Sequence, residues 1–491
     1  MNLPAEIYST DSVRRIDQNA IEQARIDAYA LMTRAAKAAL DLALRTFGDA
    51  RRWQVVCGGG NNGGDGYVLA RLAAEQGVDV TAIALVPPES LRGDAARACR
   101  DFTAAGGPVQ GWHGELDAHA ELLVDAILGS GLRRELEGHF ADAVDAICRH
   151  GAPVLALDIP SGISGDTGEV LGKAVSADRT ITFVGLKSGL FLADAPDFVG
   201  ELSFAGLDIP AECRASIVPD MRRIDEGAIS RALPRRRRSA HKGDFGHLLL
   251  VGGGPGMAGA IRLTGEAALR AGAGRVSIAT LPAHCAAIAA GRPELMCHGL
   301  GNVSDLRRLL ERATTVAIGP GLGTDDWASG LLDAVLASGL PAVVDADALN
   351  LLAQKRQRRD NWILTPHPGE AGRLLGCPAR EIQADRRRAL DDLVRRYGGV
   401  IVLKGAGTLV SAAAGPPWLC TGGNPGMAAP GMGDVLTGVI GALLAQGCTF
   451  EDASVAGVEA HARAGDVAAG QAPRGLMASD LLPALRTWVN P

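Results

Sequence analysis

The chain alternates short apolar runs with longer stretches in which apolar residues recur at helical spacing. A long helical pattern comes first, over about residues 12–47. Apolar runs that predict buried strands follow, separated by helical stretches, at residues 53–57, 78–85, 122–128, 154–159, 180–184 and 201–204. Apolar strands joined by helical crossovers indicate a parallel sheet covered on both faces, with functional loops at the carboxyl ends of the strands.

A second series of the same kind begins at residue 245 with FGHLLLVGGGPGMAGA. Its later apolar runs end in AIGPGLG, VVDADALN, ILTPHPGE and IVLKGAGT, and a last glycine loop runs directly into a helical pattern at Asp434. Between the two series the pattern lapses, and Pro234 is followed by four arginines. A solvated linker explains this segment better than a nucleic-acid site, because the net charge is −6 and no broad basic face is evident. We expect two α/β domains, residues 1–216 and 240–491, joined by a linker, residues 217–239.

Composition narrows the class of protein. The 491 residues are 47% hydrophobic, enough for large cores, and the 64 glycines gather in discrete loops, which excludes a collagen-like repeat. Nine cysteines without CxxC or Cys/His spacing exclude a disulfide or zinc framework. Without an apolar signal core or a membrane-spanning run, we expect a cytoplasmic protein with neither a membrane nor a nucleic-acid partner.

The glycine-rich stretch CGGGNNGGDG, residues 57–66, stands between a predicted strand and a predicted helix. Glycine can adopt positive φ and lets the backbone approach a ligand closely. The free N–H groups and the dipole at the start of the following helix favour an anion. This loop therefore predicts a phosphate-binding site.

A dinucleotide-dependent dehydrogenase is the first alternative, because residues 58–63 and 254–259 both fit G-x-G-x-x-G. That fingerprint needs an acidic residue about 20 positions further on to hold the ribose hydroxyls. The strand after the first match has no acid before Glu89, and the strand after the second has none before Glu294. Both matches lack the acidic residue that distinguishes a true dinucleotide-binding fingerprint, so a dehydrogenase is a minor alternative.

Several segments in order resemble one known family. GGGNNGGDGYVLAR, VDAILGSGL, LDIPSGISGDTG and FVGLKSGL, with LMTRAAKAA upstream, resemble the NAD(P)H-hydrate epimerase domain. GGGPGMAGAIRLTGEAALRAGAG, IGPGLG, VVDADALN, LTPHPGE, LKGAGT and GNPGM…GMGDVLTG resemble the ADP/ATP-dependent NAD(P)H-hydrate dehydratase of the ribokinase-like superfamily. The resemblance covers nearly the whole chain and implies a Rossmann-like three-layer α/β/α domain followed by a ribokinase-like α/β domain.

The resemblance also implies a reaction. The substrate would be NADH or NADPH with water added across one ring double bond (NADHX or NADPHX), which exists as R and S epimers. The first domain would interconvert the epimers with a bound potassium ion. The second would dehydrate the S form with ADP as co-substrate and Mg²⁺, releasing AMP and phosphate. A homo-oligomer is plausible.

In the first domain the resemblance implies substrate contacts from two segments, Asn61, Asn62, Gly63, Gly64 and Asp65 in one and Gly129, Ser130, Gly131, Leu132, Arg133, Arg134 and Glu135 in the other. It implies potassium ligands at Asn62, Asp125 and Ser161, and amide and hydroxyl oxygens suit a large, weakly charged ion. By spacing alone, Asn62 and Ser161 could equally satisfy loop amides.

Asp158, which ends the run VLALD, matches the family's substrate-contacting aspartate. A carboxylate there could shuttle a proton and stabilise an iminium-like cation while the C–O bond, or the ring, opens and recloses. It could also cap the following Pro160-Ser161-Gly162 turn. Lys187 is a further candidate, although a lysine after a strand is often a surface residue.

In the second domain Asp434 matches the catalytic base of ribokinase-like enzymes, at the start of a helix whose N–H groups would form an anion hole. The bland alternative is an N-cap aspartate. The resemblance implies nucleotide contacts at Lys404, Gly405, Ala406, Gly407, Thr408 and Gly433. It implies hydrate contacts at Ala260, Gly323, His367 and Asp434.

One segment departs from the family pattern, at two positions. The family has serine or threonine followed by two glycines after GMA, whereas this chain has Ala429, Pro430 and Gly431. Proline removes an N–H and fixes φ near −65°, which alters the expected anion hole. We expect activity to survive, since Gly431, Gly433 and Asp434 remain. Two alternatives stay open: a ribokinase-like small-molecule kinase fused to a nucleotide-binding module, and a first domain that only senses its ligand.

Overall fold

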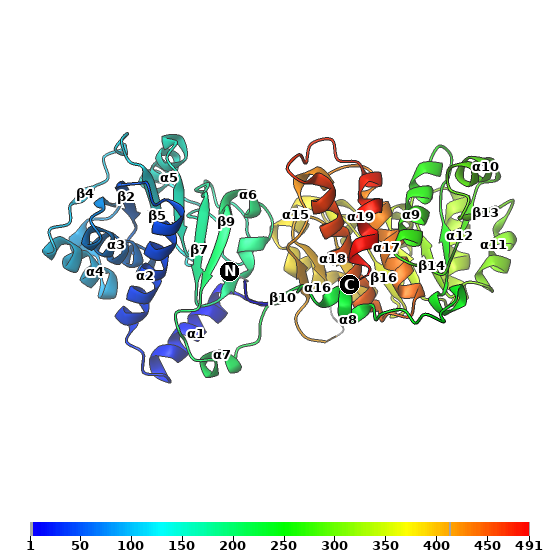
Figure 1. The fold of residues 1–491 in the computed structure, drawn as a ribbon, viewed down its shortest axis with the longest axis horizontal. Coiled ribbons are helices and arrows are strands. Elements are labelled where there is room, and N and C mark those ends of the chain that lie inside the picture. Colours follow the sequence, from blue (N-terminus) through cyan, green and yellow to red (C-terminus); the bar gives the residue numbers. More distant parts are fainter. Residues whose placement is uncertain (1–2, 412–413, 491) are drawn as a thin grey trace. The chain divides into compact units, whose positions relative to one another are not determined.

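The computed structural model describes residues 3–411 and 414–490. The chain divides into two compact units between Arg222 and Arg223 (Figure 1). That boundary lies inside residues 217–239, the predicted linker, which holds a short strand, β10 (Met221–Arg223), and a short helix, α8 (Ala228–Ala232). Residues 1–2 and 491, at the outer ends of the two predicted domains, lie outside the described residues.

Unit 1 is built on a seven-stranded sheet with the order β4-β3-β2-β5-β6-β7-β9, in which all neighbours are parallel. The strands are β2 (Arg52–Cys57), β3 (Asp79–Ala84), β4 (Val109–Gly111), β5 (Leu122–Ala126), β6 (Val154–Leu157), β7 (Arg179–Phe183) and β9 (Glu201–Ala205). The strand order reverses between β2 and β5. Doubly wound sheets bind ligands at such a switch point, outside the carboxyl ends of the strands.

Alternation along the strands sends side chains to two separate cores. Val55 of β2 joins the core under α2 (Ala28–Thr46), α3 (Asn61–Glu75) and α4 (Gly93–Ala104), whereas Val56 joins the core under α5 (Gly138–His150). The sheet therefore lies between two helical layers, and the predicted three-layer α/β/α architecture is confirmed. Outside this sheet, β1 (Glu6–Tyr8) pairs antiparallel with β10 and parallel with β8 (Leu186–Lys187).

The long helical pattern over residues 12–47 is two helices, and its prediction as one stretch was wrong. The first helix, α1 (Thr10–Glu22), ends before Arg25, which has φ 57°, and α2 begins after Asp27. The Asp27 carboxylate accepts a hydrogen bond from the N–H of Ala30 at 3.1 Å. An N-cap aspartate starts a new helix without any glycine or proline to mark the break.

Unit 2 has parallel strands in the order β13-β12-β11-β14-β15-β16-β17, extended by the antiparallel strands β18 and β19. The strands are β11 (His247–Val251), β12 (Arg275–Thr280), β13 (Met296–Gly299), β14 (Thr315–Ile318), β15 (Ala342–Val344), β16 (Trp362–Leu364), β17 (Val400–Leu403), β18 (Thr408–Val410) and β19 (Trp418–Cys420). The predicted loops follow the carboxyl ends of β11, β14, β15, β16 and β17.

The helices of unit 2 are α9 (Ala258–Arg270), α10 (Pro282–Gly291), α11 (Val303–Leu310), α12 (Asp326–Ser338), α13 (Ala346–Lys355), α14 (Pro368–Leu375), α15 (Ala379–Ala384), α16 (Arg386–Tyr397), α17 (Met432–Ala445), α18 (Phe450–Ala469) and α19 (Leu481–Trp488). The central one is α17, which packs against α9 and α18 and buries nearly every side chain. Gly438 permits this close crossing, since an added Cβ would lie 2.2 Å from the carbonyl oxygen of Thr264.

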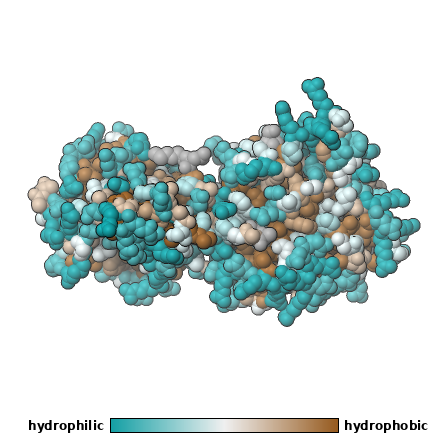
Figure 2. Space-filling view, turned by 90° about the horizontal axis from the view of Figure 1, so that it is seen from below, coloured by the Kyte–Doolittle hydropathy of each residue, from teal (hydrophilic) through white to brown (hydrophobic). Residues whose placement is uncertain are grey.

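On each unit, hydrophilic residues cover much of the face shown in Figure 2, with patches of apolar residues among them. Across residues 3–411 and 414–490, no helix is long and apolar enough to cross a membrane.

Candidate active sites

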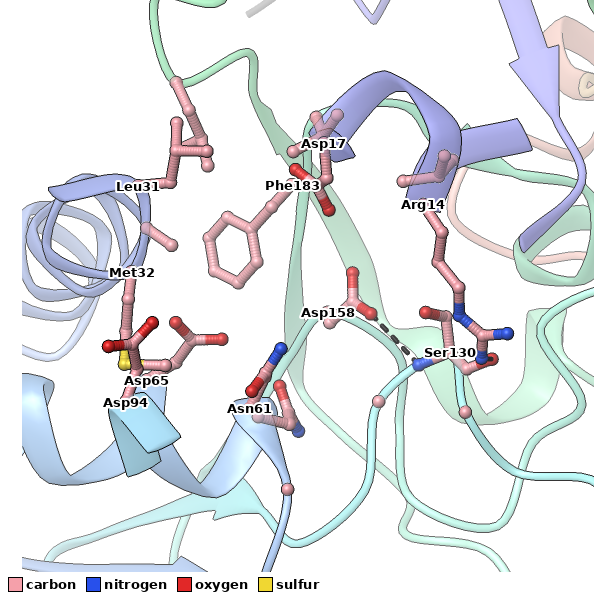
Figure 3. A pocket seen from close by; sticks show the side chains of 18 of the residues that line it. Arg14, Asp17, Leu31, Met32, Asn61, Asp65, Asp94, Ser130, Asp158 and Phe183 are labelled. Carbon is pink, nitrogen blue, oxygen red and sulfur yellow. Dashed lines mark hydrogen bonds between the residues drawn. The ribbon is translucent and has the colours of Figure 1, made fainter. Parts of the chain in front are cut away.

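A cavity of about 450 Å³ opens at the switch point of unit 1 (Figure 3). Its wall comes from α1, α2, the start of α3 and the loops after β5 and β6. The volume suits a small organic ligand. Its lining combines apolar side chains, Leu31 and Met32 among them, with charged ones, and Figure 3 shows Asp65 and Asp94 beside Met32. The cavity therefore joins a hydrophobic wall to ionisable groups.

The CGGGNNGGDG segment forms part of this wall, but not as the predicted loop. Helix α3 already begins at Asn61, with Gly60 as its N-cap, so residues 61–65 lie in its first turns. None of the segment's glycines has positive φ. They are needed for close packing instead: an added Cβ at Gly63 would lie 2.1 Å from the carbonyl oxygen of Gly58. Gly60, Asn61 and Asn62, at the start of α3, line the cavity, and a helix start offers free amides to an anion.

Asp158 is held at the cavity by three donors. One carboxylate oxygen accepts from the Lys187 ammonium and, at 3.4 Å, from the Thr182 hydroxyl; the other accepts from the N–H of Ser130 at 3.1 Å. Lys187 is buried and also donates to the carbonyl of Phe183 at 2.7 Å, so it is not a surface residue. Asp158 itself has φ 68°, a conformation that costs an L-residue free energy and clusters at functional sites.

The turn after β6 is held by a different aspartate. The Asp125 carboxylate accepts from the N–H and the hydroxyl of Ser161, at 2.7 and 2.6 Å, and from the N–H of Ile127 at 3.1 Å. The alternative in which Asp158 caps this turn was wrong, because its own oxygens point away to Lys187 and Ser130.

The predicted potassium ligands pass a simple test of fit. Asn62 is buried, and neither its amide oxygen nor its amide nitrogen has a hydrogen-bond partner among the described residues. Asp125 is fully buried, and burial raises its pKa to about 6 despite the bonds from Ser161 and Ile127. An unsatisfied amide oxygen and a buried carboxylate are donors that a cation would satisfy. No cluster of three or more His, Cys, Asp or Glu side chains suited to a metal occurs in the described parts of the chain.

The second predicted segment of unit 1 contributes only in part. Gly129, Ser130 and Gly131 line the cavity, and an added Cβ at Gly129 would lie 2.9 Å from an Asp158 oxygen. The rest of the segment, residues 132–135, is not among the lining residues. Arg133 is engaged elsewhere, by Asp11 at 2.8 Å and Asp166 at 3.2 Å.

Two further carboxylates face the cavity, Asp65, which the sequence analysis predicts, and Asp17, which it missed. No described protein group donates a hydrogen bond to either. Burial raises the pKa of Asp17 to about 6, with the nearby Lys187 opposing and Asp158 adding to the shift. Burial also raises the pKa of Asp65, and the charges of Asp158 and Asp17 add to this.

Unit 2 has its own buried lysine–aspartate pair. The Lys404 ammonium lies 2.6 Å from one oxygen of Asp345, while the other oxygen accepts from the Thr437 hydroxyl at 2.7 Å. Glu370 lies 3.8 Å from the same ammonium. Burial opposes the charge on Lys404, but Asp345 and Glu370 outweigh it and raise its pKa. Asp345 stands in the quoted VVDADALN motif, yet the sequence analysis gave it no role.

Asp434 lies near that pair but makes no described hydrogen bond with either member. It lies in the first turn of α17, whose N-cap is Gly431, and no side chain caps this helix. The N-cap alternative for Asp434 was therefore wrong. Burial, followed by the charge of Asp345, raises the pKa of Asp434 to about 7, while Lys404 acts in the opposite direction. A carboxylate with that pKa beside a helix N-terminus suits a general base.

A buried arginine holds the predicted nucleotide loop, residues 404–408, through hydrogen bonds to its backbone carbonyls. Arg386 donates to the carbonyls of Leu403, Lys404 and Gly407 at 3.1 to 3.4 Å, and it has no carboxylate partner among the described residues. Thr408 closes the loop by donating to the carbonyl of Gly405 at 2.9 Å. The sequence did not single out Arg386, because a run of three arginines is typical of a solvent-exposed helix face.

His367 is half-exposed and caps α14. Its Nδ1 accepts a hydrogen bond from the backbone N–H of Gly369 at 2.9 Å. The backbone N–H of His367 donates to the Glu370 carboxylate at 2.8 Å. Burial, then the charge of Lys404, lowers the pKa of His367. Nδ1 is therefore engaged as an acceptor, and Nε2 lies 3.4 Å from Glu370.

The remaining predicted residues of unit 2 are Gly433, Gly323 and Ala260. An added Cβ at Gly433 would lie 3.2 Å from the Lys404 ammonium. The N–H of Gly323 donates to Asp347 at 2.8 Å, and the charge of Asp347 contributes to the raised pKa of Asp434. Ala260, on α9, lies beside Gly321 in the same glycine loop as Gly323.

Two family models match the chain, one in each unit. Residues 28–189 match the N-terminal domain of YjeF-related proteins, and residues 248–486 match NAD(P)H-hydrate dehydratase. A bifunctional NAD(P)H-hydrate repair enzyme of Coxiella burnetii is 46% identical over 486 residues, covering 99% of each chain. This chain belongs to that family. The expected kinase alternative is not favoured, because the repair-enzyme relative matches both units.

Solved structures agree for unit 2 of this repair-enzyme chain. A ribokinase-like superfamily protein of Enterococcus faecalis is 31% identical, with a TM-score of 0.51, and covers 55% of this chain and 98% of its own. An ADP/ATP-dependent NAD(P)H-hydrate dehydratase of Bacillus subtilis, co-crystallised with ATP and Mg²⁺, is 30% identical, with a TM-score of 0.49, over 56% of this chain and 98% of its own. The Enterococcus faecalis structure confirms the predicted ribokinase-like fold of the second domain.

Proposed function

We propose that this member of the repair-enzyme family restores hydrated NADH and NADPH in two steps, one on each unit. Unit 1 interconverts the R and S hydrates, and unit 2 dehydrates the S hydrate with ADP, releasing AMP and phosphate. The observation that carries this proposal is that each unit of this family member presents a carboxylate and a lysine at the carboxyl end of its parallel sheet.

In unit 1 the dinucleotide phosphates would bind the free amides at the start of α3, next to Asn61 and Asn62. The hydrated ring would enter the cavity beside Asp158, whose charge stabilises the cation that forms when the ring carbon loses its hydroxyl. Lys187, Thr182 and the Ser130 amide hold that carboxylate in place. The apolar wall at Leu31 and Met32 would exclude bulk water from the opened intermediate.

In unit 2 Asp434 takes the proton of the hydrate hydroxyl as its oxygen attacks the terminal phosphorus of ADP, and AMP leaves. The lone pair of the ring nitrogen then expels phosphate, and loss of a proton from the neighbouring ring carbon restores the double bond. Lys404, the amides of the loop that Arg386 fixes and the start of α17 would stabilise the transferring phosphoryl group.

The proposed ions follow the same division. Potassium would be held by Asn62, Asp125 and Ser161, where it would fix the loops that carry Gly129 and Asp158. Mg²⁺ would accompany the nucleotide phosphates in unit 2, as it neutralises phosphate charge in phosphoryl transfer. A homo-oligomer remains a proposal that size-exclusion chromatography with light scattering would test.

The test mixes purified protein with both epimers of NADH hydrate and ADP, and follows NADH absorbance together with free phosphate. Recovery of both epimers, stoichiometric with phosphate, is the expected result. Recovery that stops at the S fraction would remove the epimerase role of unit 1 and leave a ligand-binding domain. A stable phosphorylated product without NADH would contradict the dehydratase and favour a kinase.

A further inference from the structure

Helix α1 brings an acid to the cavity of unit 1 that no comparison assigns. Val13, Ile16 and Ala20 of this helix pack into the core, and Asp17 lies at the edge of that buried face. The match to the family model begins only at residue 28. Figure 3 shows the Asp17 carboxylate directed into the same space as the carboxylate of Asp158.

The two carboxylates differ in what surrounds them. Both oxygens of Asp158 accept hydrogen bonds, from Lys187, Thr182 and Ser130, so Asp158 is held as an anion that accepts and does not donate. No described protein group bonds to the Asp17 side chain, which is free to carry a proton and to donate it.

The charge balance of the cavity also favours a protonated acid. Asp17, Asp65 and Asp158 share one buried lysine, Lys187, so ionising all three would leave an excess of negative charge in a desolvated space. The remaining charged lining residues are Asp94 and Arg14, and Arg14 is already paired with Asp11 at 3.1 Å.

We propose that Asp17 is the proton donor of the epimerisation, working across the cavity from the ionised Asp158. This inference rests on the epimerase role proposed above for unit 1. Asp65 suits the step less well, because burial keeps its pKa far above the ordinary value, whereas the pKa of Asp17, about 6, allows it to release and recover a proton near neutral pH.

The step balances without any co-reactant. The Asp17 acid gives its proton to the hydroxyl oxygen as the ring carbon–oxygen bond breaks, and that electron pair leaves with a water molecule. The lone pair of the ring nitrogen forms a carbon–nitrogen double bond, and the resulting cation faces Asp158. The cation then turns its other face toward Asp17, and a water molecule adds to that face and returns one proton to Asp17, which leaves the other epimer.

The experiment compares Asp17→Asn, Asp17→Glu and Glu22→Gln in the full-length chain. Glu22 lies on the same helix, is exposed and bonds only to Gln18, so it is the matched control. We expect Asp17→Asn to lose at least ~100-fold in the rate of epimer exchange, Asp17→Glu to recover part of it, and Glu22→Gln to match the wild type. ADP-dependent dehydration of pure S hydrate, measured on the same samples, should be unchanged and reports that the chain is folded.

Wild-type exchange should also fall as the pH rises past about 6, and Asp17→Asn should lack this decline. An Asp17→Asn variant that exchanges epimers at the wild-type rate, or that keeps the decline, would overturn the assignment while leaving the epimerase role intact. A wild-type chain that does not exchange epimers at all would instead remove the proposed function of unit 1.

Discussion

Each unit buries one lysine–aspartate ion pair in its site, and the two pairs relate differently to the aspartate that the sequence analysis predicted as catalytic. In unit 1 that aspartate, Asp158, is itself the partner of Lys187. In unit 2 the partner of Lys404 is Asp345, while the predicted base, Asp434, has no hydrogen bond from any described residue. Both sites also contain at least one carboxylate to which no described residue donates a hydrogen bond.

The difference between the paired and the unpaired aspartates distinguishes two roles of a buried carboxylate. A paired carboxylate is held as an anion, which fixes a lysine and offers a negative charge. An unpaired one keeps a raised pKa and can exchange a proton near neutral pH, as for Asp434 at about 7. By this criterion the counterpart of Asp434 in unit 1 is Asp17 rather than Asp158.

The largest effect is expected for Asp434→Asn. Without the base for the hydrate hydroxyl, dehydration of S hydrate should fall by ~10³-fold or more, while epimer exchange on unit 1 stays at the wild-type rate. The measurement is ADP-dependent recovery of NADH absorbance, with epimer exchange followed separately by chromatography. Dehydration within tenfold of wild type would show that another group supplies the base.

Asp158→Asn tests the pair in unit 1. It should abolish epimer exchange, leave dehydration of S hydrate intact and strand the Lys187 ammonium, which costs about 3–5 kcal/mol of unfolding free energy when a buried pair loses one partner. Chemical denaturation of the full chain measures this loss.

The matched control for that variant is Asp158→Asn with Lys187→Met. Removing both charges should restore most of the lost stability but none of the exchange. If the double variant is as unstable as the single one, the lysine–aspartate pair is not the source of the loss; if Asp158→Asn still exchanges epimers, Asp158 is not part of the mechanism.

Potassium should affect only one of the two activities. Replacing K⁺ by Na⁺ should slow epimer exchange several-fold, because the loops that carry Gly129 and Asp158 lose their proposed ligand, and dehydration should be unaffected. Asn62→Leu should make the residual exchange insensitive to the choice of ion. Equal inhibition of both activities would place the ion's effect outside unit 1.

The smallest effect is expected at the departure from the family pattern. Pro430 precedes Gly431, which has φ 89° and caps α17, so the helix start already has its required geometry. Pro430→Gly should therefore change the dehydration rate by no more than a few-fold. A large gain in rate would show that the anion hole is impaired by the missing N–H.

The pattern of apolar residues predicted both sheets, since buried parallel strands are continuous apolar runs that stand out between helices. It missed the break between α1 and α2, because an aspartate at position 27 is a weak signal beside a glycine or proline. It predicted a phosphate-binding loop over residues 57–66, where glycine can adopt positive φ, whereas none of these glycines has positive φ and they are needed where α3 packs closely on the sheet.

The predicted site residues were those inside glycine-rich motifs, where local spacing carries the signal. The missed ones lie elsewhere. Asp17 is one polar residue of an amphipathic helix, and Arg386 is one arginine in a charged run, so only the fold shows that Asp17 lines a cavity and that Arg386 is buried. Asp345 differs, since its motif was visible but its partner Lys404 is 59 residues away.

The most direct test of the acid role of Asp17 and the base role of Asp434 is the pH dependence of the two activities of one wild-type sample. Each activity is measured by itself between about pH 5 and pH 9. Exchange needs the protonated form of Asp17, so its rate should fall as the pH rises past about 6. Dehydration needs the ionised form of Asp434, so its rate should rise as the pH passes about 7. Opposite slopes are the predicted result. Slopes of the same sign would contradict the account that the unpaired carboxylate of each unit exchanges the proton, as an acid in unit 1 and as a base in unit 2.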